Sequence, residues 1–342
     1  MRATVMRGGR LVVDTVPDPD PGPGEVLART LACGICGSDL HALRHAPALA
    51  AAARESDVPF TLDPKRDVVL GHEFCAEIVD FGPDTARVLR RGTRVVSVPL
   101  AAGTDGIETI GFSNRYPGGY GELMRLSELL VLPVPDDLAT EHAALTEPMA
   151  VGVHAVAKAG LGPDDAPVVV GCGPVGLAVI AALRLRDVAP IVAADFSPAR
   201  RALAARLGAH VVVDPERERA IEAWQRTAAG RRAVIFECVG VPGLLDRIMR
   251  DAPREARVVV AGVCMEDDRI RPVLGINKEL SIQFVLGYTP TEFADTLRDI
   301  AEGRLSVAPL VTGRVGVEGV AGAFETLASP DAHAKILVEP WR

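Results

Sequence analysis

The sequence predicts an α/β protein in two parts, a β-rich N-terminal part followed by a doubly wound parallel sheet. Up to about residue 135, short apolar or alternating runs are separated by clusters of Gly and Pro, which is typical of strands joined by turns. From residue 167 onward, short apolar runs alternate with longer segments of helical periodicity, as the strands and crossover helices of a parallel sheet do. The length of 342 residues gives room for two such domains.

The first part is expected to be mainly sheet. Strands are predicted at 11–16, 26–31, 74–79, 94–98, 122–126 and 129–134. Between them, the alanine-rich stretch 46–54 predicts a short helix, and the polar segment 57–67 predicts a loop. From Thr140 to Lys158 the apolar residues follow a helical period, so a helix leads out of this part.

The second part alternates regularly between strand and helix. Strands are predicted at 168–170, 191–194, 211–213, 233–236, 257–263 and 280–286, with helices at 175–186, 198–207, 216–227 and 242–250. The tail is predicted to hold helices at 291–302 and 317–327 and a last strand at 335–338.

The composition excludes several classes of protein. A hydrophobic content of 48% with 24% charged residues is typical of a globular protein. The net charge of -8 leaves no basic face, so no nucleic-acid partner is expected. No apolar run approaches the roughly 20 residues of a membrane span, and the first residues lack the core of a signal peptide, so no membrane association is expected. The cytoplasm is the expected location, where the six cysteines stay reduced rather than forming disulfides.

The segment Gly171-Cys172-Gly173-Pro174-Val175-Gly176 fits the pattern G-x-G-x-x-G. It follows a predicted strand and opens a predicted helix, which is the context in which the pattern binds a dinucleotide instead of only packing. Gly171 allows the tight turn, Gly173 lets the backbone approach a pyrophosphate, and Gly176 lets the helix pack closely on the strand. This part is therefore predicted to be a Rossmann domain, with the phosphates at the helix N-terminus.

Asp195 ends the next predicted strand, nineteen residues after Gly176 (195 − 176). A carboxylate there hydrogen-bonds the adenosine ribose and repels a 2′-phosphate, so NAD is expected rather than NADP. Arg200 is predicted to lie over the adenine. The remaining predicted cofactor contacts are Pro174, Val175, Val239, Val263 and Leu286.

The nine residues from Cys33 to His41 contain two thiols, a hydroxyl, a carboxylate and an imidazole. Three interpretations are open from this segment alone: a zinc site, a thioredoxin-like pair with C-x-x-C spacing, and a buried turn whose cysteines act as small hydrophobes. His72 begins a later strand, and Glu147 precedes a proline at the start of a helix. A thiolate, an imidazole and a carboxylate from separate segments would leave an open position on zinc, as a catalytic site requires.

The chain resembles the zinc-dependent medium-chain dehydrogenase/reductase family, in particular its alcohol and polyol dehydrogenases. The resemblance covers essentially the whole chain and rests on Cys36-Gly37-Ser38-Asp39-Leu40-His41, Gly71-His72-Glu73, Gly118-Gly119-Tyr120-Gly121-Glu122, Glu147-Pro148 and the segment from Gly171 to Gly176. It implies that residues 1–150 and 289–342 form a GroES-like catalytic domain and residues 151–288 the Rossmann domain.

The resemblance also implies roles for the residues near Cys36. Cys36 and His72 would bind the zinc, together with Glu147 or with Glu73. Glu73 could instead contact the ligands without binding the metal itself. Asp39 would orient His72. Cys33 matches no ligand position and would be a buried small residue.

Ser38 and His41 would carry the substrate proton to solvent through a cofactor ribose hydroxyl. Each also has a simpler interpretation from the sequence. Ser38 follows Gly37 and could be the N-cap of a helix, and His41 could be an exposed helical residue.

Two departures from the family pattern narrow the prediction. Segment 96–117 contains no cysteine, whereas many members bind a structural zinc there, so one catalytic zinc per chain is expected. Polyol dehydrogenases have an arginine near the end of the sheet where this chain has Gly287, which argues against a polyhydroxylated substrate. The resemblance further suggests a homodimer or homotetramer built through the strand at 280–286.

The predicted activity is the reversible oxidation of a secondary or aromatic alcohol to a ketone or aldehyde, with hydride transfer to NAD and zinc as Lewis acid on the substrate oxygen. One alternative is a zinc-free NADPH quinone or enoyl reductase of the same superfamily. Another is a nucleotide-binding protein without catalysis. Both alternatives lack a use for the Cys36, His72 and Glu147 set.

Overall fold

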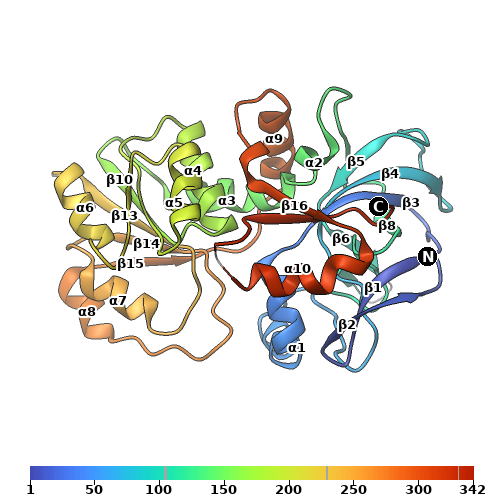
Figure 1. Cartoon of the computed structure of the whole chain (residues 1–342), viewed down its shortest axis with the longest axis horizontal. Helices are drawn as coiled ribbons and strands as arrows, with labels where there is room; N and C mark the ends of the chain where they lie inside the picture. Colours follow the sequence, from blue (N-terminus) through green and yellow to red (C-terminus); the bar gives the residue numbers. More distant parts are fainter. Residues whose placement is uncertain (104–105, 229, 330) are drawn as a thin grey trace. The chain divides into compact units, whose positions relative to one another are not determined.

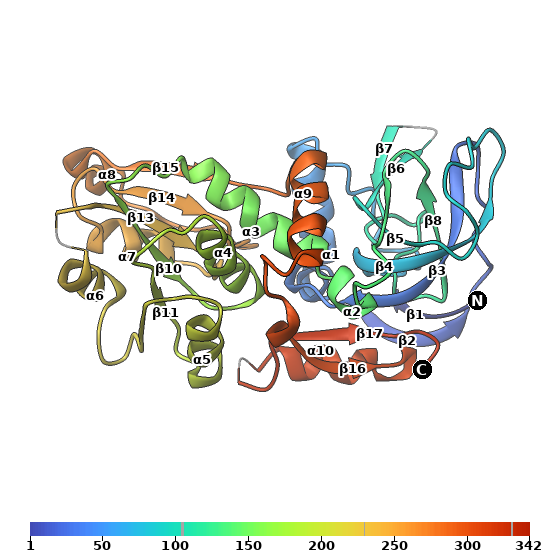
Figure 2. The same ribbon diagram turned by 90° about the horizontal axis from the view of Figure 1, so that it is seen from above.

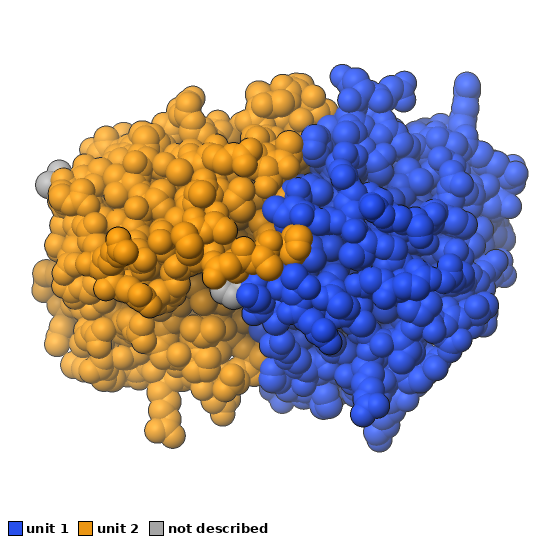
Figure 3. Space-filling view, in the orientation of Figure 1, with its two compact units in different colours: residues 1–147, 311–329, 335–342 blue, residues 148–310, 330–334 orange. Residues whose placement is uncertain are grey.

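The computed structural model describes residues 1–103, 106–228, 230–329 and 331–342, which form two compact units. Unit 1 contains 1–147, 311–329 and 335–342, and unit 2 contains 148–310 and 330–334 (Figure 3). Segment 290–310 therefore belongs to unit 2 and not, as expected, to the GroES-like part. The reason is helix α9 (Pro290–Ala301), which buries Phe293, Leu297 and Ile300 and whose Glu292 accepts a hydrogen bond from His154 of unit 2. The assignment of functions to the two domains stays a prediction.

Unit 1 is built on a seven-stranded sheet in the order β16-β17-β3-β4-β5-β9, with β8 also paired to β3. Its strands are β3 (Glu25–Gly34), β4 (Glu73–Phe81), β5 (Arg94–Ser97), β8 (Leu123–Ser127), β9 (Val131–Pro133), β16 (Val311–Val315) and β17 (Lys335–Val338). Two hairpins accompany it, β1 (Arg2–Arg7) with β2 (Arg10–Thr15) and β6 (Leu100–Gly103) with β7 (Gly106–Thr109). Figure 2 shows α10 (Val320–Leu327) alongside β16 and β17. The C-terminal strand thus completes the N-terminal sheet.

Helix α1 (Gly37–Glu55) begins nine residues earlier than the helix predicted at 46–54 (46 − 37). Cys36 is its N-cap residue, and the side chain of Asp39 accepts a hydrogen bond from the Cys36 amide at 2.9 Å, which satisfies one of the free amides at the helix start. Pro47 lies inside the helix and accounts for the kink at His45. Ser38 lies inside the first turn, so the alternative in which it caps the helix is wrong.

Unit 2 is built on a six-stranded parallel sheet in the order β12-β11-β10-β13-β14-β15. Its strands are β10 (Asp165–Val170), β11 (Val192–Ala194), β12 (Val211–Val213), β13 (Arg232–Glu237), β14 (Arg257–Val260) and β15 (Ser281–Phe284). Numbered along the chain, this is the order 3-2-1-4-5-6 of a Rossmann domain, whose ligand site lies at the carboxyl ends of the first and fourth strands. The predicted fold class is confirmed.

Helices cover both faces of this parallel sheet. They are α4 (Pro174–Leu185), α5 (Pro198–Arg206), α6 (Ala220–Thr227), α7 (Leu244–Asp251) and α8 (Pro272–Lys278). In Figure 1, α4 and α5 lie on one face and α6 and α7 on the other. The helix predicted at 140–158 is two helices, α2 (Thr140–Ala143) and α3 (Thr146–Ala159), which places Glu147 in the first turn of α3. Among the described residues, no helix is both long and apolar enough to span a membrane.

Hydrogen bonds to one buried carboxylate join the loop at 57–67 to the hairpin β6–β7. Glu108 accepts hydrogen bonds from the hydroxyls of Thr61 at 2.7 Å and Ser113 at 2.5 Å, and it also pairs with Arg115. Next to it, the ring of Phe60 stacks on Phe112 with centroids 4.7 Å apart. Many family members bind a structural zinc in this part of the chain. Here a buried carboxylate and two stacked rings hold the loop and the hairpin together.

Replacing Glu108 should loosen this lobe. In Glu108→Ala the two hydroxyls and the guanidinium lose their shared acceptor, so the free energy of unfolding should fall by about 2 kcal/mol, as for other hydrogen bonds to a charged group. Urea unfolding measures this loss. Glu318→Ala, which removes an ion pair between two exposed side chains, is the control and should stay within about 0.5 kcal/mol of the parent. Equal stability of the two variants would contradict the role given to Glu108.

Candidate active site

The pairing of β3 with β4 brings the three predicted ligands in this region together. Gly34 at the end of β3 lies opposite Glu73 at the start of β4, so Cys36 reaches the same place as His72 and Glu73. The ligand atoms of Cys36, His72 and Glu73 all lie within 4.8 Å of one another. Glycine is needed at position 34, because a Cβ there would collide with the Glu73 carboxylate. A thiolate, an imidazole and a carboxylate in one buried cluster are a donor set that suits zinc.

Behind this cluster, Asp39 faces the imidazole of His72. The distance from Asp39 Oδ1 to His72 Nδ1 is 3.4 Å, and neither atom has a hydrogen bond to any other described residue. Burial opposes protonation of His72, but the carboxylate of Asp39 and the nearby Cys36 outweigh it and raise the pKa of His72 well above its usual value. This arrangement fits a metal bound through Nε2, with the Nδ1 hydrogen directed at Asp39.

Lys335 is a further residue of this cluster, which the sequence analysis missed. Its Nζ donates to both carboxylate oxygens of Glu73 at 2.7 Å and to the carbonyl of Ile35 at 3.1 Å, and both side chains are almost completely buried. Burial lowers the pKa of Lys335, yet Glu73 and its other acidic neighbours raise it on balance, so the ammonium stays charged. The only local signal was a lysine at the start of an apolar strand.

The charges of the cluster also fit a divalent cation. With Cys36 deprotonated, as metal binding requires, Cys36, Asp39 and Glu73 carry three negative charges and Lys335 carries one positive charge (3 − 1 = 2). The raised pKa of His72 makes its imidazolium an alternative counter-charge; once His72 is neutral, as a metal ligand must be, two negative charges in a buried site would be costly without a cation. Zinc would balance them, so the residues present fit the metal that the sequence predicts.

The two predicted acidic ligands, Glu73 and Glu147, lie at different places in the structure. Glu73 belongs to the compact cluster, whereas Glu147 in the first turn of α3 does not, among the residues that the structure describes. Glu147 is nevertheless near enough for its charge to raise the pKa of Lys335. The geometry therefore favours Glu73 beside the metal, and the ligand set itself stays a prediction.

Cys33 is not part of the cluster. It is fully buried, and burial together with Asp39 and Glu73 raises the pKa of its thiol well above the usual value. Its sulfur packs where side chains at Gly71 and Gly119 would otherwise be. All six cysteines of the chain are unpaired, as expected. A small buried residue is the role that the structure supports for Cys33, and a reactive C-x-x-C pair is not.

Ser38 and His41 lie one turn apart at the start of α1, directly after Cys36, and both are partly buried. Burial and the positive neighbours His45 and Arg44 lower the pKa of His41. An imidazole with a lowered pKa is neutral at pH 7 and can accept a proton. The relay through these two residues stays a prediction.

The glycine segment of unit 2 has the predicted geometry. Gly171 has a φ of +90°, Gly173 caps α4 and Pro174 is in the first turn of this helix. A Cβ at Gly176 would collide with the carbonyl of Gly171, so this glycine allows the strand and the helix to meet. Val175 follows Pro174 in the same turn, so free amides of α4 are available for an anion.

Asp195 follows β11 at the expected place. Its carboxylate accepts hydrogen bonds from the amides of Cys172 at 2.7 Å and Ser197 at 2.8 Å, which fix it beside the glycine turn. Ser197 also caps α5, and Arg200 of this helix reaches back so that its Nη1 lies 3.8 Å from where a Gly173 Cβ would be. These residues lie together at the carboxyl end of the sheet, where a dinucleotide binds.

Three of the five predicted apolar contacts, Val239, Val263 and Leu286, are solvent-exposed. Val239 and Val263 follow β13 and β14. A Cβ at Gly240 would collide with the backbone of Val263, so a glycine is needed between these two loops. Leu286 follows β15 and is 69% exposed. Their contact with a cofactor stays a prediction.

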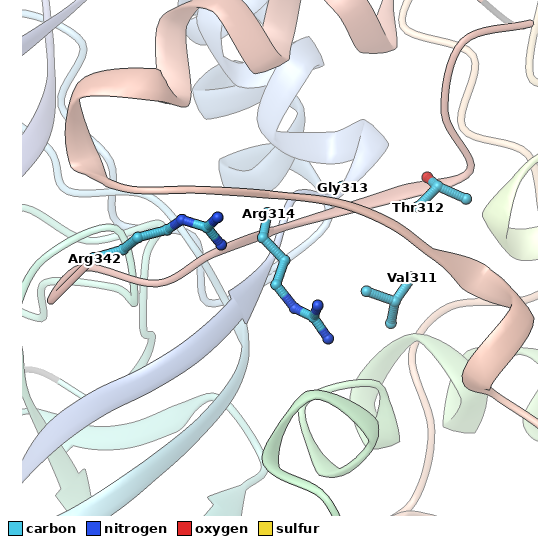
Figure 4. Close-up of a pocket in the computed structure, with 5 residues that line it drawn as sticks. All are labelled: Val311, Thr312, Gly313, Arg314 and Arg342. Carbon is cyan, nitrogen blue, oxygen red and sulfur yellow. The ribbon is translucent and has the colours of Figure 1, made fainter.

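A hollow runs along β16, the strand that pairs with β17. It is lined by Val311, Thr312, Gly313, Arg314 and Arg342 (Figure 4). Arg314 is paired with Glu141 at 3.0 Å and with Glu339 at 3.1 Å, and Arg342 also pairs with Glu339. Because acidic partners compensate both arginines, the hollow is not a good anion site.

Comparison with known proteins agrees with these observations. Residues 22–136 match the model of the alcohol dehydrogenase GroES-like domain, and residues 174–302 match that of a zinc-binding dehydrogenase. The chain is 32% identical to the (R,R)-butanediol dehydrogenase of Bacillus subtilis, over 96% of each chain. It is 30% identical to the sorbitol dehydrogenase of Bos taurus, over 93% of this chain and 90% of that protein. The crystal structure of a 2R,3R-butanediol dehydrogenase from Bacillus subtilis superposes with a TM-score of 0.85 at 30% identity, covering 99% of each chain.

The fold and the matched families define an oxidoreductase with a GroES-like domain and a Rossmann domain. The chain belongs to the zinc-dependent medium-chain dehydrogenase/reductase family. The family resemblance stated from the sequence is confirmed.

The ion pair between Lys335 and Glu73 should be essential for stability. Lys335→Met leaves a buried carboxylate without its partner, so the free energy of unfolding should fall by about 3 kcal/mol when measured by denaturant in the presence of a chelator. Lys65→Met, at an exposed position, should change it by less than about 0.5 kcal/mol. The double variant Lys335→Met/Glu73→Gln should be more stable than Lys335→Met, because it no longer buries an unpaired charge. A single variant as stable as Lys65→Met would refute the pairing.

Proposed function

We propose that this protein is a zinc-dependent, NAD-linked dehydrogenase that interconverts a secondary alcohol and the corresponding ketone. The observation that carries this proposal is the convergence of Cys36, His72 and Glu73 in one cluster, whose charges a divalent cation would balance when all three bind it. A zinc ion held there would supply Lewis acidity toward the substrate oxygen. Among the described residues this is the one such cluster, which supports one zinc per chain.

In this proposal each residue of the cluster has a separate task. Cys36 and His72 hold the metal, and Glu73 adds a carboxylate whose position is fixed by Lys335. Ser38 and His41 accept the substrate proton and pass it on, because residues three apart on a helix share one face. The lowered pKa of His41 keeps this imidazole ready to accept a proton at neutral pH.

The surroundings of His72 favour a substrate with apolar substituents. The buried ring of Phe112 lies 5.2 Å from the imidazole of His72, and the partly exposed Phe60 stacks on Phe112, so the wall beside the metal cluster is aromatic. Butanediol and sorbitol, which name two relatives, both contain secondary alcohol groups. The wall, together with Gly287 in place of an arginine, supports a simple secondary or aromatic alcohol, or a small diol, over a polyol.

Two finer points belong to the same proposal. Asp195 at the glycine turn supports NAD over NADP. A homodimer is supported by β15, the last strand in the order of the sheet, near which Ile276, Phe284 and Leu286 are each more than 60% exposed. Location in the cytoplasm stays a prediction.

Substitution of a ligand tests the metal chemistry. Cys36→Ala and His72→Ala should each lose bound zinc, measured by mass spectrometry of the metal in purified protein, and turnover of secondary alcohols should fall to background. Cys75→Ala, which removes a buried thiol of β4 outside the cluster, is the matched control and should keep both. Variants that keep zinc and turnover would rule out the proposed mechanism.

Substitution of the acidic residue at the glycine turn tests the cofactor. Asp195→Asn removes the charge that repels a 2′-phosphate and keeps one oxygen to accept from a backbone amide in place of two. We expect kcat/KM to fall by about tenfold with NAD, as for a lost charge-assisted hydrogen bond, and to rise with NADP. The absorbance of the reduced nicotinamide gives both values. A parent enzyme that prefers NADP, or a variant with an unchanged NAD preference, would contradict this assignment.

A further inference from the structure

We infer that Tyr120 is a positioning residue of the metal centre, which acts by holding Asp39 in the orientation that His72 needs. Its hydroxyl donates to Asp39 Oδ2 at 2.6 Å, and both side chains are completely buried. The inference rests on the zinc site of the proposed function and adds a third residue to the chain of contacts behind the ligand: Tyr120, Asp39 and His72.

The two oxygens of Asp39 have different partners. Oδ2 accepts two hydrogen bonds, from the Tyr120 hydroxyl and from the Cys36 amide at 2.9 Å. Oδ1 has no hydrogen bond to a described residue and faces His72 Nδ1 at 3.4 Å. Both donors to Oδ2 therefore fix the plane of the carboxylate so that Oδ1 remains for the imidazole. One of these donors is the backbone amide of Cys36, so the Tyr120 hydroxyl is the side-chain donor that holds Asp39.

Tyr120 can only be a donor in this contact. Burial and the charge of Asp39 raise the pKa of Tyr120 well above its usual value, so its hydroxyl keeps the proton. A carboxylate offers only acceptors, hence the hydrogen of this bond comes from the tyrosine. Without it, Asp39 Oδ2 would be a buried acceptor with the Cys36 amide as its remaining donor.

The backbone and the ring of Tyr120 also make contacts that fix its position. Its amide donates to the carbonyl of Leu70 at 3.0 Å, and its carbonyl accepts from the amide of Thr4 at 2.9 Å. Its ring fills the space beside Gly71, where a Cβ would come within 2.7 Å of it, and packs edge-on against Phe324. The same side chain thus supports the backbone just before His72 and the carboxylate behind it.

The consequence for the metal concerns the tautomer of His72. An Nδ1 hydrogen directed at Asp39 leaves Nε2 unprotonated and free to bind zinc. When the carboxylate can rotate, this preference weakens. Loss of a group that orients a ligand typically costs 10- to 100-fold in metal affinity, and Tyr120 acts one contact further away. We therefore expect Tyr120→Phe to weaken zinc binding by about tenfold.

The chain offers a matched control in the same segment. Tyr116 is also a buried tyrosine whose hydroxyl donates to a carboxylate, that of Glu25 at 2.9 Å, but neither residue touches the metal cluster. Tyr116→Phe removes the same kind of hydrogen bond without reaching His72. It controls for the loss of stability that a missing buried hydroxyl causes.

The experiment measures zinc affinity by competition with a chromophoric chelator for the parent chain, Tyr120→Phe, Tyr116→Phe, Asp39→Asn and Tyr120→Phe/Asp39→Asn. Thermal unfolding shows that each variant is folded. Absorption spectra of the cobalt-loaded proteins report the ligand geometry. Should Tyr120→Phe not fold, 4-methylphenylalanine at position 120 fills the volume without a donor and replaces it.

We expect Tyr120→Phe to bind zinc about tenfold more weakly with a shifted cobalt spectrum, Tyr116→Phe to match the parent in both, and the tyrosine substitution to have no further effect once Asp39 is Asn. Equal zinc affinity of the two tyrosine variants, or an undiminished effect of Tyr120→Phe in the Asp39→Asn background, would overturn the inference. A parent chain that binds no zinc would instead overturn the proposed function, so the two failures are distinguishable.

Discussion

Buried charge is the constraint on which the candidate active site depends. Asp39 and Glu73 are both completely buried within a few ångströms of the Cys36 thiol and the His72 imidazole. Carboxylates are not buried without compensation, because the loss of hydration costs several kcal/mol for each ion. Lys335 supplies one compensating charge, and the imidazolium of His72 or a bound divalent cation would supply the other. Strand β17 comes from the end of the chain and pairs with β3, so the fold of unit 1 is completed by the same strand that brings this lysine to Glu73.

The candidate nucleotide site of unit 2 depends on backbone geometry more than on charge. Gly171 turns the chain with a positive φ, and Gly176 lets α4 approach β10. Asp195 is held by two backbone amides, so its position follows from the turn itself. A site of this kind is made from residues close together in the sequence, whereas the metal cluster is made from segments that only the sheet brings together.

This difference explains what the sequence could and could not predict. The glycine segment and Asp195 were found from local spacing, because strand, turn and helix follow one another directly. Cys36 and His72 were predicted as ligands from motifs that the resemblance supplied, and the structure brings their ligand atoms together. Lys335 and Tyr120 have no such local signal, since their roles arise from the pairing of β17 with β3 and from the packing of Tyr120 beside Gly71. The choice of Glu73 over Glu147 likewise depends on the register of β3 and β4. The start of α1 was missed because the prediction followed the alanine-rich stretch, while the helix begins at the Cys36 cap.

X-ray absorption at the zinc edge of the purified, zinc-loaded protein tests the central claim most directly. The account predicts one zinc per chain with a single sulfur neighbour at about 2.3 Å, from Cys36, and nitrogen and oxygen neighbours at about 2.0 to 2.2 Å for the rest. A first shell with two or more sulfur atoms, or with none, would contradict it, because Cys36 is the one cysteine in the cluster that the described residues form.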